Sequence, residues 1–186
     1  WKRPNDKMPK MKELSEKELT DKAERYCIQA ERCCSEVARK LETWGAQDTQ
    51  TASIMAHLLQ ERFIDEERFA VAFARDKMRY NHWGRVKITY ALREKEVAQE
   101  LIQNALEQLD SEEYDEMLQR ILRDKWKLVK GKNDYECRQK VIRFALGRGF
   151  GMQEVLHALD ALGRGEAEDE SVSYTHLRAH ETKAHL

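Results

Sequence analysis

The nine residues "TYALREKEV" (89–97) have two counterparts in the same chain, and the three segments together indicate the fold. The counterparts are "ARKLETWG" (38–45) and "RFALGRGF" (143–150), and the alignment places Leu41, Leu92 and Leu146 in one register. A period of roughly 50 residues is typical of proteins built from tandem repeats of a small structural unit.

The residues around these segments predict three helices in each unit. Downstream of each segment lies a pair of apolar residues spaced four apart, which places both on one helix face. The pairs are Ile54 with Leu58, Ile102 with Leu106, and Val155 with Leu159. Upstream, "FARDK" (73–77) resembles "ILRDK" (121–125). Each unit is therefore interpreted as a basic first helix, a second helix that ends in a tight turn, and a short third helix.

Composition agrees with an all-helical chain. Of 186 residues only eight are Gly and two are Pro, and both prolines lie within the first ten residues. Good helix formers dominate the remainder. The predicted fold is all-α, with three tandem three-helix repeats in an elongated, curved array.

The predicted boundaries follow the repeat and the capping residues. Helix N-caps are expected at Ser15 (with Glu18 as a capping box), Asp65, Ser111 and Asn133. The predicted parts are a charged N-terminal arm (1–20), repeat 1 (21–64), repeat 2 (65–110), repeat 3 (111–162) and a disordered tail (163–186). The final "SYTHLRAHETKAHL" (173–186) does not resemble the rest of the chain. It looks like translated cloning sequence and is excluded from the functional argument.

Charge is strongly segregated along a chain whose formal net charge is only -1. Residues 75–95 hold seven Lys or Arg against two acids, and residues 120–148 hold ten against three. Between them, residues 96–119 hold eight acids and no Lys or Arg. Stacked repeats would align the basic helices into one positive face, suited to phosphate groups or to an acidic protein surface.

The "Trp83-Gly84" dipeptide lies at the expected turn between the first two helices of repeat 2. We expect Gly84 to take a positive φ that ends the first helix. Trp83 has two interpretations: it packs the two helices together, or it contacts a nucleic-acid base or a partner. The predicted core of the second and third repeats comprises Phe69, Phe73, Ile88, Leu92, Leu146 and Phe150.

Several kinds of chemistry find no support in the sequence. It contains no GxxxxGK[ST], HExxH or GxSxG motif, so no catalytic residue is predicted. Its four cysteines (27, 33, 34 and 137) lack metal-ligand spacing, so we expect free thiols in a reducing cytoplasm and no metal or cofactor. No apolar run approaches the roughly 18–20 residues that span a bilayer. The chain is predicted to be a cytoplasmic binding protein without a membrane segment.

One segment carries a family resemblance. "IDEERFAVAFARDKMRYNHWGRVKITYALREKEV" (64–97) resembles the central motif of the RecX family of recombination regulators. The matching positions are Asp65 and Glu66, Arg68-Phe69-Ala70, Arg75 to Arg79, Gly84, Lys87-Ile88, Leu92 and Lys95. The likeness extends from about residue 23 to 162. One position departs: the family often has Lys-Gly where this chain has Lys95-Glu96, so this turn is expected to close without a left-handed glycine, whereas repeat 3 keeps Gly149.

The resemblance implies a function that composition alone does not. RecX proteins are similar helical arrays that bind the groove of the RecA filament, also contact its DNA, and damp its ATPase, strand exchange and co-protease activities. It implies a non-enzymatic, monomeric inhibitor acting in DNA recombination, DNA repair and the SOS response. The implied partners are the RecA filament and single-stranded DNA, with duplex DNA left open.

The predicted contact residues are the bases of the positive face, with Trp83. They are Arg75, Lys77, Arg79, Trp83, Arg85, Lys87, Arg93 and Lys95 in repeat 2, and Arg123, Lys125, Lys127, Lys130, Lys132, Arg138, Lys140 and Arg143 in repeat 3. Two alternatives remain open: a helical adaptor that binds an acidic protein, and a DNA binder of helix-turn-helix type.

Overall fold

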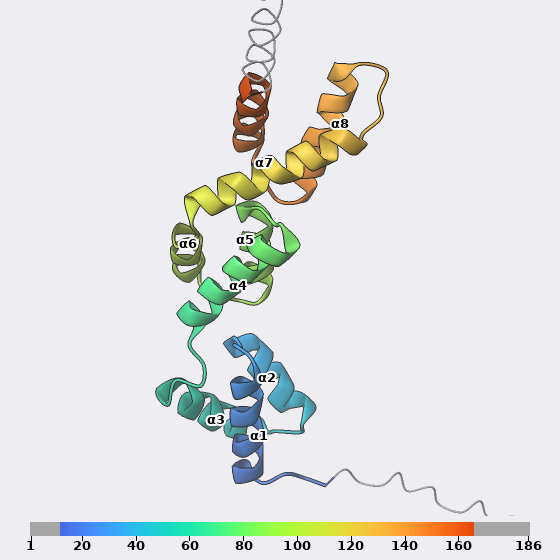
Figure 1. Ribbon diagram of the computed structural model, residues 1–186. Helices are drawn as coiled ribbons and strands as arrows, with labels where there is room; N and C mark the ends of the chain where they lie inside the picture. Colours follow the sequence, from blue (N-terminus) through green and yellow to red (C-terminus); the bar gives the residue numbers. More distant parts are fainter. Residues whose placement is uncertain (1–11, 166–186) are drawn as a thin grey trace, which may run out of the picture.

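The computed structural model describes residues 12–165, and every regular element in that range is a helix (Figure 1). The elements are α1 (Glu16–Gln29), α2 (Cys34–Thr43), α3 (Asp48–Gln60), α4 (Glu66–Asn81), α5 (Arg85–Glu94), α6 (Gln99–Glu107), α7 (Ser111–Leu128) and α8 (Asp134–Gly147). A further helix covers residues 152–165.

The helices pack in successive groups of three. Helices α1, α2 and α3 contact one another, as do α4, α5 and α6, and α7 packs on α8 beside the 152–165 helix. We refer to these groups as repeat 1, repeat 2 and repeat 3. Figure 1 shows the repeats stacked one after another in an elongated array. The predicted all-α array of three-helix repeats is confirmed.

The second helix of each repeat ends in the same hydrogen-bonded turn. In α2 the N–H groups of Gly45 and Ala46 donate to the carbonyl groups of Glu42 and Leu41. The same pair of bonds closes α5 and α8, where the inner bonds run from Val97 to Leu92 and from Phe150 to Ala145. This arrangement is the Schellman motif, which satisfies the last carbonyl groups of a helix.

The shared turn corrects the alignment made from sequence. Leu41 and Leu92 are fully buried, and the equivalent residue of repeat 3 is Ala145, not Leu146. Leu146 is 36% exposed, so its prediction as a core residue is wrong. The sequence alignment was one residue out because Leu146 resembles Leu41 and Leu92 more closely than the small Ala145 does.

The other predicted core residues lie in or against the core. Phe69, Ile88, Leu92 and Phe150 are buried. Phe73 is half-buried and packs against the cluster, with its ring 5.7 Å from that of Phe69.

The core itself divides unevenly among the repeats. One apolar cluster runs continuously through repeats 2 and 3, and a second, separate cluster fills repeat 1. Cys33 is the buried residue of repeat 1 that belongs to the larger cluster. Repeats 2 and 3 therefore form one packed body, to which repeat 1 attaches through a narrower contact.

The predicted helix starts are mostly observed. Ser15 and Glu18 form the capping box of α1, Asp65 caps α4, and Asn133 caps α8. At α7 the cap is Asp110, which accepts from the backbone N–H of Glu113, and Ser111 is the first helical residue instead. Asp110 precedes Ser111, so both residues offered a side-chain oxygen at this helix start.

Two predicted terminal segments overlap with helices. Because the Ser15 capping box starts α1 at Glu16, part of the predicted arm (1–20) is helical. The last described helix continues through residue 165, which includes the first three residues of the predicted tail. The remainder of both predictions, residues 1–11 and 166–186, lies outside the described residues.

Candidate binding site

The candidate site is built on the contacts between repeats. At the first joint, between repeats 1 and 2, the Glu66 carboxylate accepts from the backbone N–H of Cys34 at 2.9 Å. The Ser35 hydroxyl donates to the Lys95 carbonyl group at 2.7 Å, and the Lys95 ammonium pairs with Glu36 at 2.6 Å. The start of α2 is thereby held between α4 and the α5–α6 turn.

The second joint, between repeats 2 and 3, repeats this geometry. The Tyr114 hydroxyl accepts from the backbone N–H of Arg85 at 3.1 Å, as Glu66 does from Cys34. The N–H groups of Gly84 and Val86 donate to the carbonyl groups of Arg148 and Gly149 at 2.8 and 2.9 Å. In both joints the acceptor lies on the first helix of the later repeat, α4 or α7. The donor is the backbone N–H of the residue that begins the second helix of the earlier repeat, α2 or α5.

The role predicted for Gly84 is wrong. Gly84 has φ -82° and is the N-cap of α5, while the left-handed residue that ends α4 is His82, with φ 55°. A Cβ atom at Gly84 would lie 2.6 Å from the Phe150 nitrogen, and one at Gly149 would lie 2.6 Å from the Lys87 nitrogen. Glycine is needed at position 84 because the two backbones touch there, and not because of the helix end.

Three of the predicted contact residues are engaged within the joints. Arg79 makes a two-pronged pair with Glu113, with N–O distances of 2.6 and 3.1 Å, and this bonding raises the pKa of Arg79 and lowers that of Glu113. The Arg85 guanidinium lies 3.9 Å from the centre of the Tyr114 ring and 3.5 Å from the Glu154 carboxylate. Lys95 pairs with Glu36. These three cations hold repeats together.

Tyr114 is the central side chain of the second joint. It is fully buried, packs on Phe150 and donates its hydroxyl hydrogen to Glu154 at 3.0 Å. Burial raises the pKa of the Tyr114 phenol above its ordinary value, so this hydroxyl stays protonated. One hydroxyl therefore accepts from α5 and donates to the 152–165 helix at the same time.

Other cations of the predicted contact set lie beside aromatic rings and are not paired with carboxylates in the described part of the chain. The ammonium groups of Lys77 and Lys87 lie 4.8 and 4.7 Å from the Trp83 ring centre. Trp83 is half-buried and packs against the core, as the packing interpretation predicted. Lys77 and Lys87 have no ion-pair partner among residues 12–165.

A second cation–aromatic cluster continues this face into repeat 3. Lys125 and Arg148 lie over the Phe144 ring, at 4.7 and 5.4 Å from its centre. The Arg148 guanidinium also donates to the Asn81 carbonyl group at 3.2 Å, which places it at the end of α4 beside the Trp83 turn. We call Lys77, Trp83, Lys87, Lys125 and Arg148 the joint face.

Arg148 was not among the predicted contact residues. A signal for it was available: it is the C-cap of α8, the position that Lys95 occupies in α5. The sequence alignment placed Leu146 in register with Leu92, one residue out, so Arg148 was not recognised as the equivalent of Lys95.

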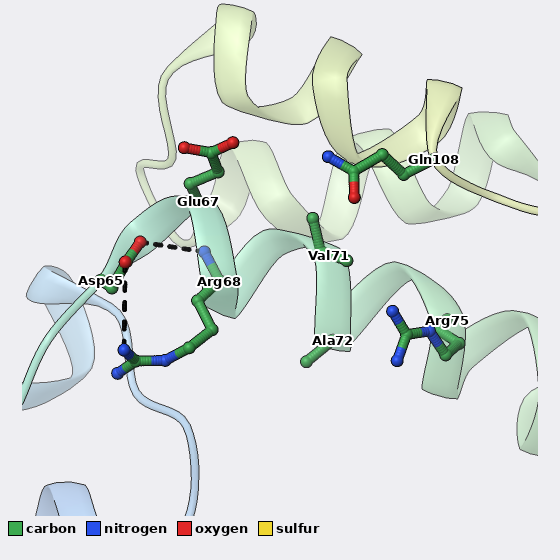
Figure 2. A pocket seen from close by; sticks show the side chains of 7 residues that line it. All are labelled: Asp65, Glu67, Arg68, Val71, Ala72, Arg75 and Gln108. Carbon is green, nitrogen blue, oxygen red and sulfur yellow. Dashed lines mark hydrogen bonds and ion pairs between the residues drawn. The ribbon is translucent and has the colours of Figure 1, made fainter.

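Arg75 and Arg93 lie away from the joint face. Arg75 is exposed and lines a shallow cavity of about 330 Å³, together with Arg68 and Gln108 (Figure 2). In Figure 2 the carboxylate of Asp65 is engaged by Arg68, while Arg75 stands further along α4. Arg93 is exposed, bonded to Gln99 and 6.0 Å from the Tyr90 ring centre.

The remaining predicted bases surround α7 and α8. Arg123, Lys127 and Arg138 line a cavity of about 210 Å³, which Trp126 also lines. Arg138 pairs with Asp160 at 3.4 Å, and Lys140 pairs with Glu136 at 3.8 Å. Lys140 also donates to the Lys130 carbonyl group, the Lys132 N–H donates to Glu136, and Arg143 is exposed. The structure therefore divides the predicted contact set into several surfaces.

Within residues 12–165 there is no cluster of three potential metal-ligating His, Cys, Asp or Glu side chains. None of the described helices combines the length and the apolar character needed to cross a membrane. The four cysteines are free, and burial raises the pKa of Cys27 to about 11 and that of Cys34 to about 12.

Comparison with known proteins gives one consistent result. The family model for the second three-helix domain of RecX matches residues 65–106, and the model for the third matches residues 112–159. The regulatory protein RecX of Chlorobium phaeobacteroides strain BS1 is 27% identical over 154 residues, covering 83% of this chain and 99% of that protein.

Other relatives are longer than this chain. The regulatory protein RecX of Clostridium perfringens strain 13 is 26% identical over 117 residues, which are 62% of this chain and 54% of that protein. The chain thus spans about half the length of this relative.

Solved structures agree on the fold. The crystal structure of RecX from Lactobacillus salivarius superposes with a TM-score of 0.73 at 17% identity, covering 80% of this chain and 96% of that one. A crystal structure of another regulatory protein RecX gives a TM-score of 0.69 at 21% identity, covering 80% and 79%.

Proposed function

Because this chain belongs to the RecX family of regulatory proteins, we propose that it regulates the RecA recombinase by binding RecA filaments through its joint face. The regulation is non-enzymatic: the chain acts by occupying a surface. The filament's single-stranded DNA is a second partner in this proposal.

The observation that carries the proposal is the joint face itself. Lys77, Lys87 and Arg148 are cations of two different repeats, gathered beside Trp83 and Phe144 without carboxylate partners among residues 12–165. By contrast, Arg79, Arg85 and Lys95 are neutralised inside the joints. Unpaired cations next to aromatic rings suit a phosphate backbone or an acidic protein surface.

The elongated array supports a mechanism by occupancy. Stacked repeats present one extended surface, which can lie along a helical groove and touch more than one filament subunit (Figure 1). A chain held there would block addition of further RecA subunits, or the conformational change that ATP hydrolysis requires.

The test of the proposed function is RecA ATPase activity on single-stranded DNA, measured while this chain is titrated from substoichiometric to equimolar amounts. We expect the rate of ATP hydrolysis to fall while this chain is still substoichiometric to RecA, because one bound chain affects several filament subunits. An unchanged rate at equimolar ratio, with the chain shown to be folded by circular dichroism, would falsify the proposal.

The salt dependence of binding separates DNA contacts from protein contacts. If four to six cations meet phosphate groups, log K for single-stranded DNA should fall with log[salt] at a slope of about -3 to -5. A flat dependence together with tight binding to an acidic protein would favour the adaptor alternative.

One observation argues against a helix-turn-helix reader. In that class the N-terminal residues of the second helix contact base edges in the major groove. Here the start of α5 is covered by repeat 3, since Gly84, Arg85 and Val86 all donate their N–H groups to it.

A further inference from the structure

The two joints can be compared residue by residue, because they are the same structure made from different sequences. Glu36 is the third residue of α2, and Lys87 is the third residue of α5. Lys95 is the C-cap of α5, and Arg148 is the C-cap of α8. Glu36 and Lys95 meet at the first joint, so their equivalents at the second joint are Lys87 and Arg148.

The charges at these equivalent positions differ in a specific way. At the first joint, the Glu36 carboxylate neutralises the Lys95 ammonium at 2.6 Å. At the second joint both equivalents are cations, and neither has an ion-pair partner among residues 12–165. The Lys87 ammonium lies over Trp83 instead, and the Arg148 guanidinium lies over Phe144 and donates to Asn81.

The backbone prevents these two residues from separating. Gly149, next to Arg148, is in direct contact with the Lys87 backbone, and Val86 is hydrogen-bonded to the Gly149 carbonyl group at 2.9 Å. Lys77 adds a third cation over the same Trp83 ring. All three side chains are only partly exposed, which reduces the screening of like charges by water.

We propose that the second joint is a phosphate-binding site, in which a nucleic-acid phosphate group takes the place that the Glu36 carboxylate has at the first joint. Lys87 and Arg148 hold the phosphate from either side of the contact between repeats 2 and 3, and Lys77 is the third ligand. The inference rests on the proposed function and deepens it by naming the group that is bound and the residues that bind it.

A regulatory consequence follows from the position of the site. Its ligands come from repeat 2 (Lys77 and Lys87) and from repeat 3 (Arg148), so a bound phosphate joins the two repeats. Binding along a nucleic-acid strand therefore stiffens the array at this joint, because phosphate removes the repulsion between the cations.

The comparison of joints supplies the decisive variant, Lys87→Glu. It places at the second joint the carboxylate that the first joint already has, so we expect the full-length chain to unfold at an equal or higher temperature in phosphate-free, low-salt buffer. Its binding to a fluorescein-labelled oligothymidine, followed by anisotropy, should be weaker, and the slope of log K against log[salt] should be shallower by about one to two.

Two further variants control this result. Lys87→Gln removes the charge without adding a carboxylate, and it should reduce the slope by about one even if Lys87→Glu does not fold. Glu36→Lys creates the like-charge pair at the first joint, away from Trp83, and it should lower thermal stability without weakening oligothymidine binding. Unchanged affinity and slope in both Lys87 variants would overturn the inference.

The source of the phosphate is distinguished in the same experiment. If the oligothymidine raises the unfolding temperature of the unmodified chain and inorganic phosphate at equal phosphate concentration does not, the ligand is nucleic acid. If inorganic phosphate alone stabilises the unmodified chain, but not Lys87→Glu, the site binds free phosphate and the nucleic-acid assignment is overturned.

Failure of the proposed function would look different. Oligothymidine binding that depends on Lys87, together with an unchanged RecA ATPase rate, would support the phosphate site and contradict the RecA role. If Lys87→Glu changes neither the inhibition of RecA nor the binding of oligothymidine, the result would support the RecA role and contradict the phosphate site.

Discussion

At the scale of single residues, Glu96 is the exception among three equivalent turns. The left-handed residue of the turn is Gly45 in repeat 1 and Gly149 in repeat 3, but it is Glu96 in repeat 2, with φ 62°. The sequence correctly indicated that this turn closes without a glycine, yet the left-handed conformation itself is retained. A residue with a Cβ atom is strained in this conformation.

We therefore predict that Glu96→Gly stabilises the protein by about 1 kcal/mol, since glycine adopts this conformation without steric cost. Urea unfolding at equilibrium measures the change. A matched substitution, Glu116→Gly, lies at an exposed position in the interior of α7 and should destabilise by about 1 kcal/mol. Equal destabilisation by both changes would show that the φ of Glu96 contributes no strain.

Gly84 gives a second residue-scale prediction. Gly84→Ala should destabilise the protein by about 3 kcal/mol, because the new Cβ atom would overlap the backbone of Gly149 and Phe150. Gly147→Ala is the control, since a Cβ atom at Gly147 meets nothing within 4 Å and lies at the end of helical α8. The control should be neutral or slightly stabilising. Thermal or urea unfolding of both variants decides the point.

The residues that could be assigned from the sequence are those whose role is local. Ser15, Asp65 and Asn133 were identified as caps because a cap depends on the next three residues alone. The role of Gly84 was missed because its neighbour is Gly149, far away in the sequence. No local pattern reports a contact between two backbones.

At the scale of elements, the helices were predictable and their contacts were less so. Apolar residues at helical spacing and the near-absence of Gly and Pro predicted an all-α repeat, because burial of one helix face sets that pattern. Which cations lie inside a joint depends on the acids of another repeat. Arg79 and Arg85 resemble Lys77 and Lys87 in sequence, yet Glu113 and Glu154 engage only the first two.

The second joint yields the element-scale prediction, Tyr114→Phe. The change removes the acceptor for the Arg85 N–H and the donor to Glu154, so we expect a loss of about 2 kcal/mol in the free energy of unfolding. Tyr135→Phe is the control, because Tyr135 is 71% exposed and should tolerate the change. Urea unfolding measures both variants; equal stability would mean that this hydroxyl does not hold the joint together.

At the scale of the whole molecule, the array is a packed body of two repeats with a third attached. Repeats 2 and 3 share one apolar cluster, while repeat 1 has its own core and joins the rest mainly through Cys33, Glu66 and the Glu36–Lys95 pair. The joint face lies on the two-repeat body, which keeps its cations in fixed positions relative to one another. This rigidity suits recognition of a regular surface such as a filament.

The central claim is that the joint face carries the regulation of RecA. The direct measurement is RecA ATPase activity on single-stranded DNA with two charge-reversed forms of the chain, both shown to be folded. One carries Lys77→Glu in α4 and Lys125→Glu in α7, two cations of the joint face, and it leaves Arg79 in place because its pair with Glu113 holds the second joint. The other carries Arg25→Glu in α1 and Arg39→Glu in α2, two exposed bases of repeat 1.

Both forms change the net charge of the chain equally, so a general electrostatic effect would weaken them alike. We predict that the joint-face form no longer inhibits ATP hydrolysis, whereas the repeat 1 form inhibits it as the unmodified chain does. Full inhibition by the joint-face form, or equal loss in both forms, would contradict the assignment of the function to the joint face.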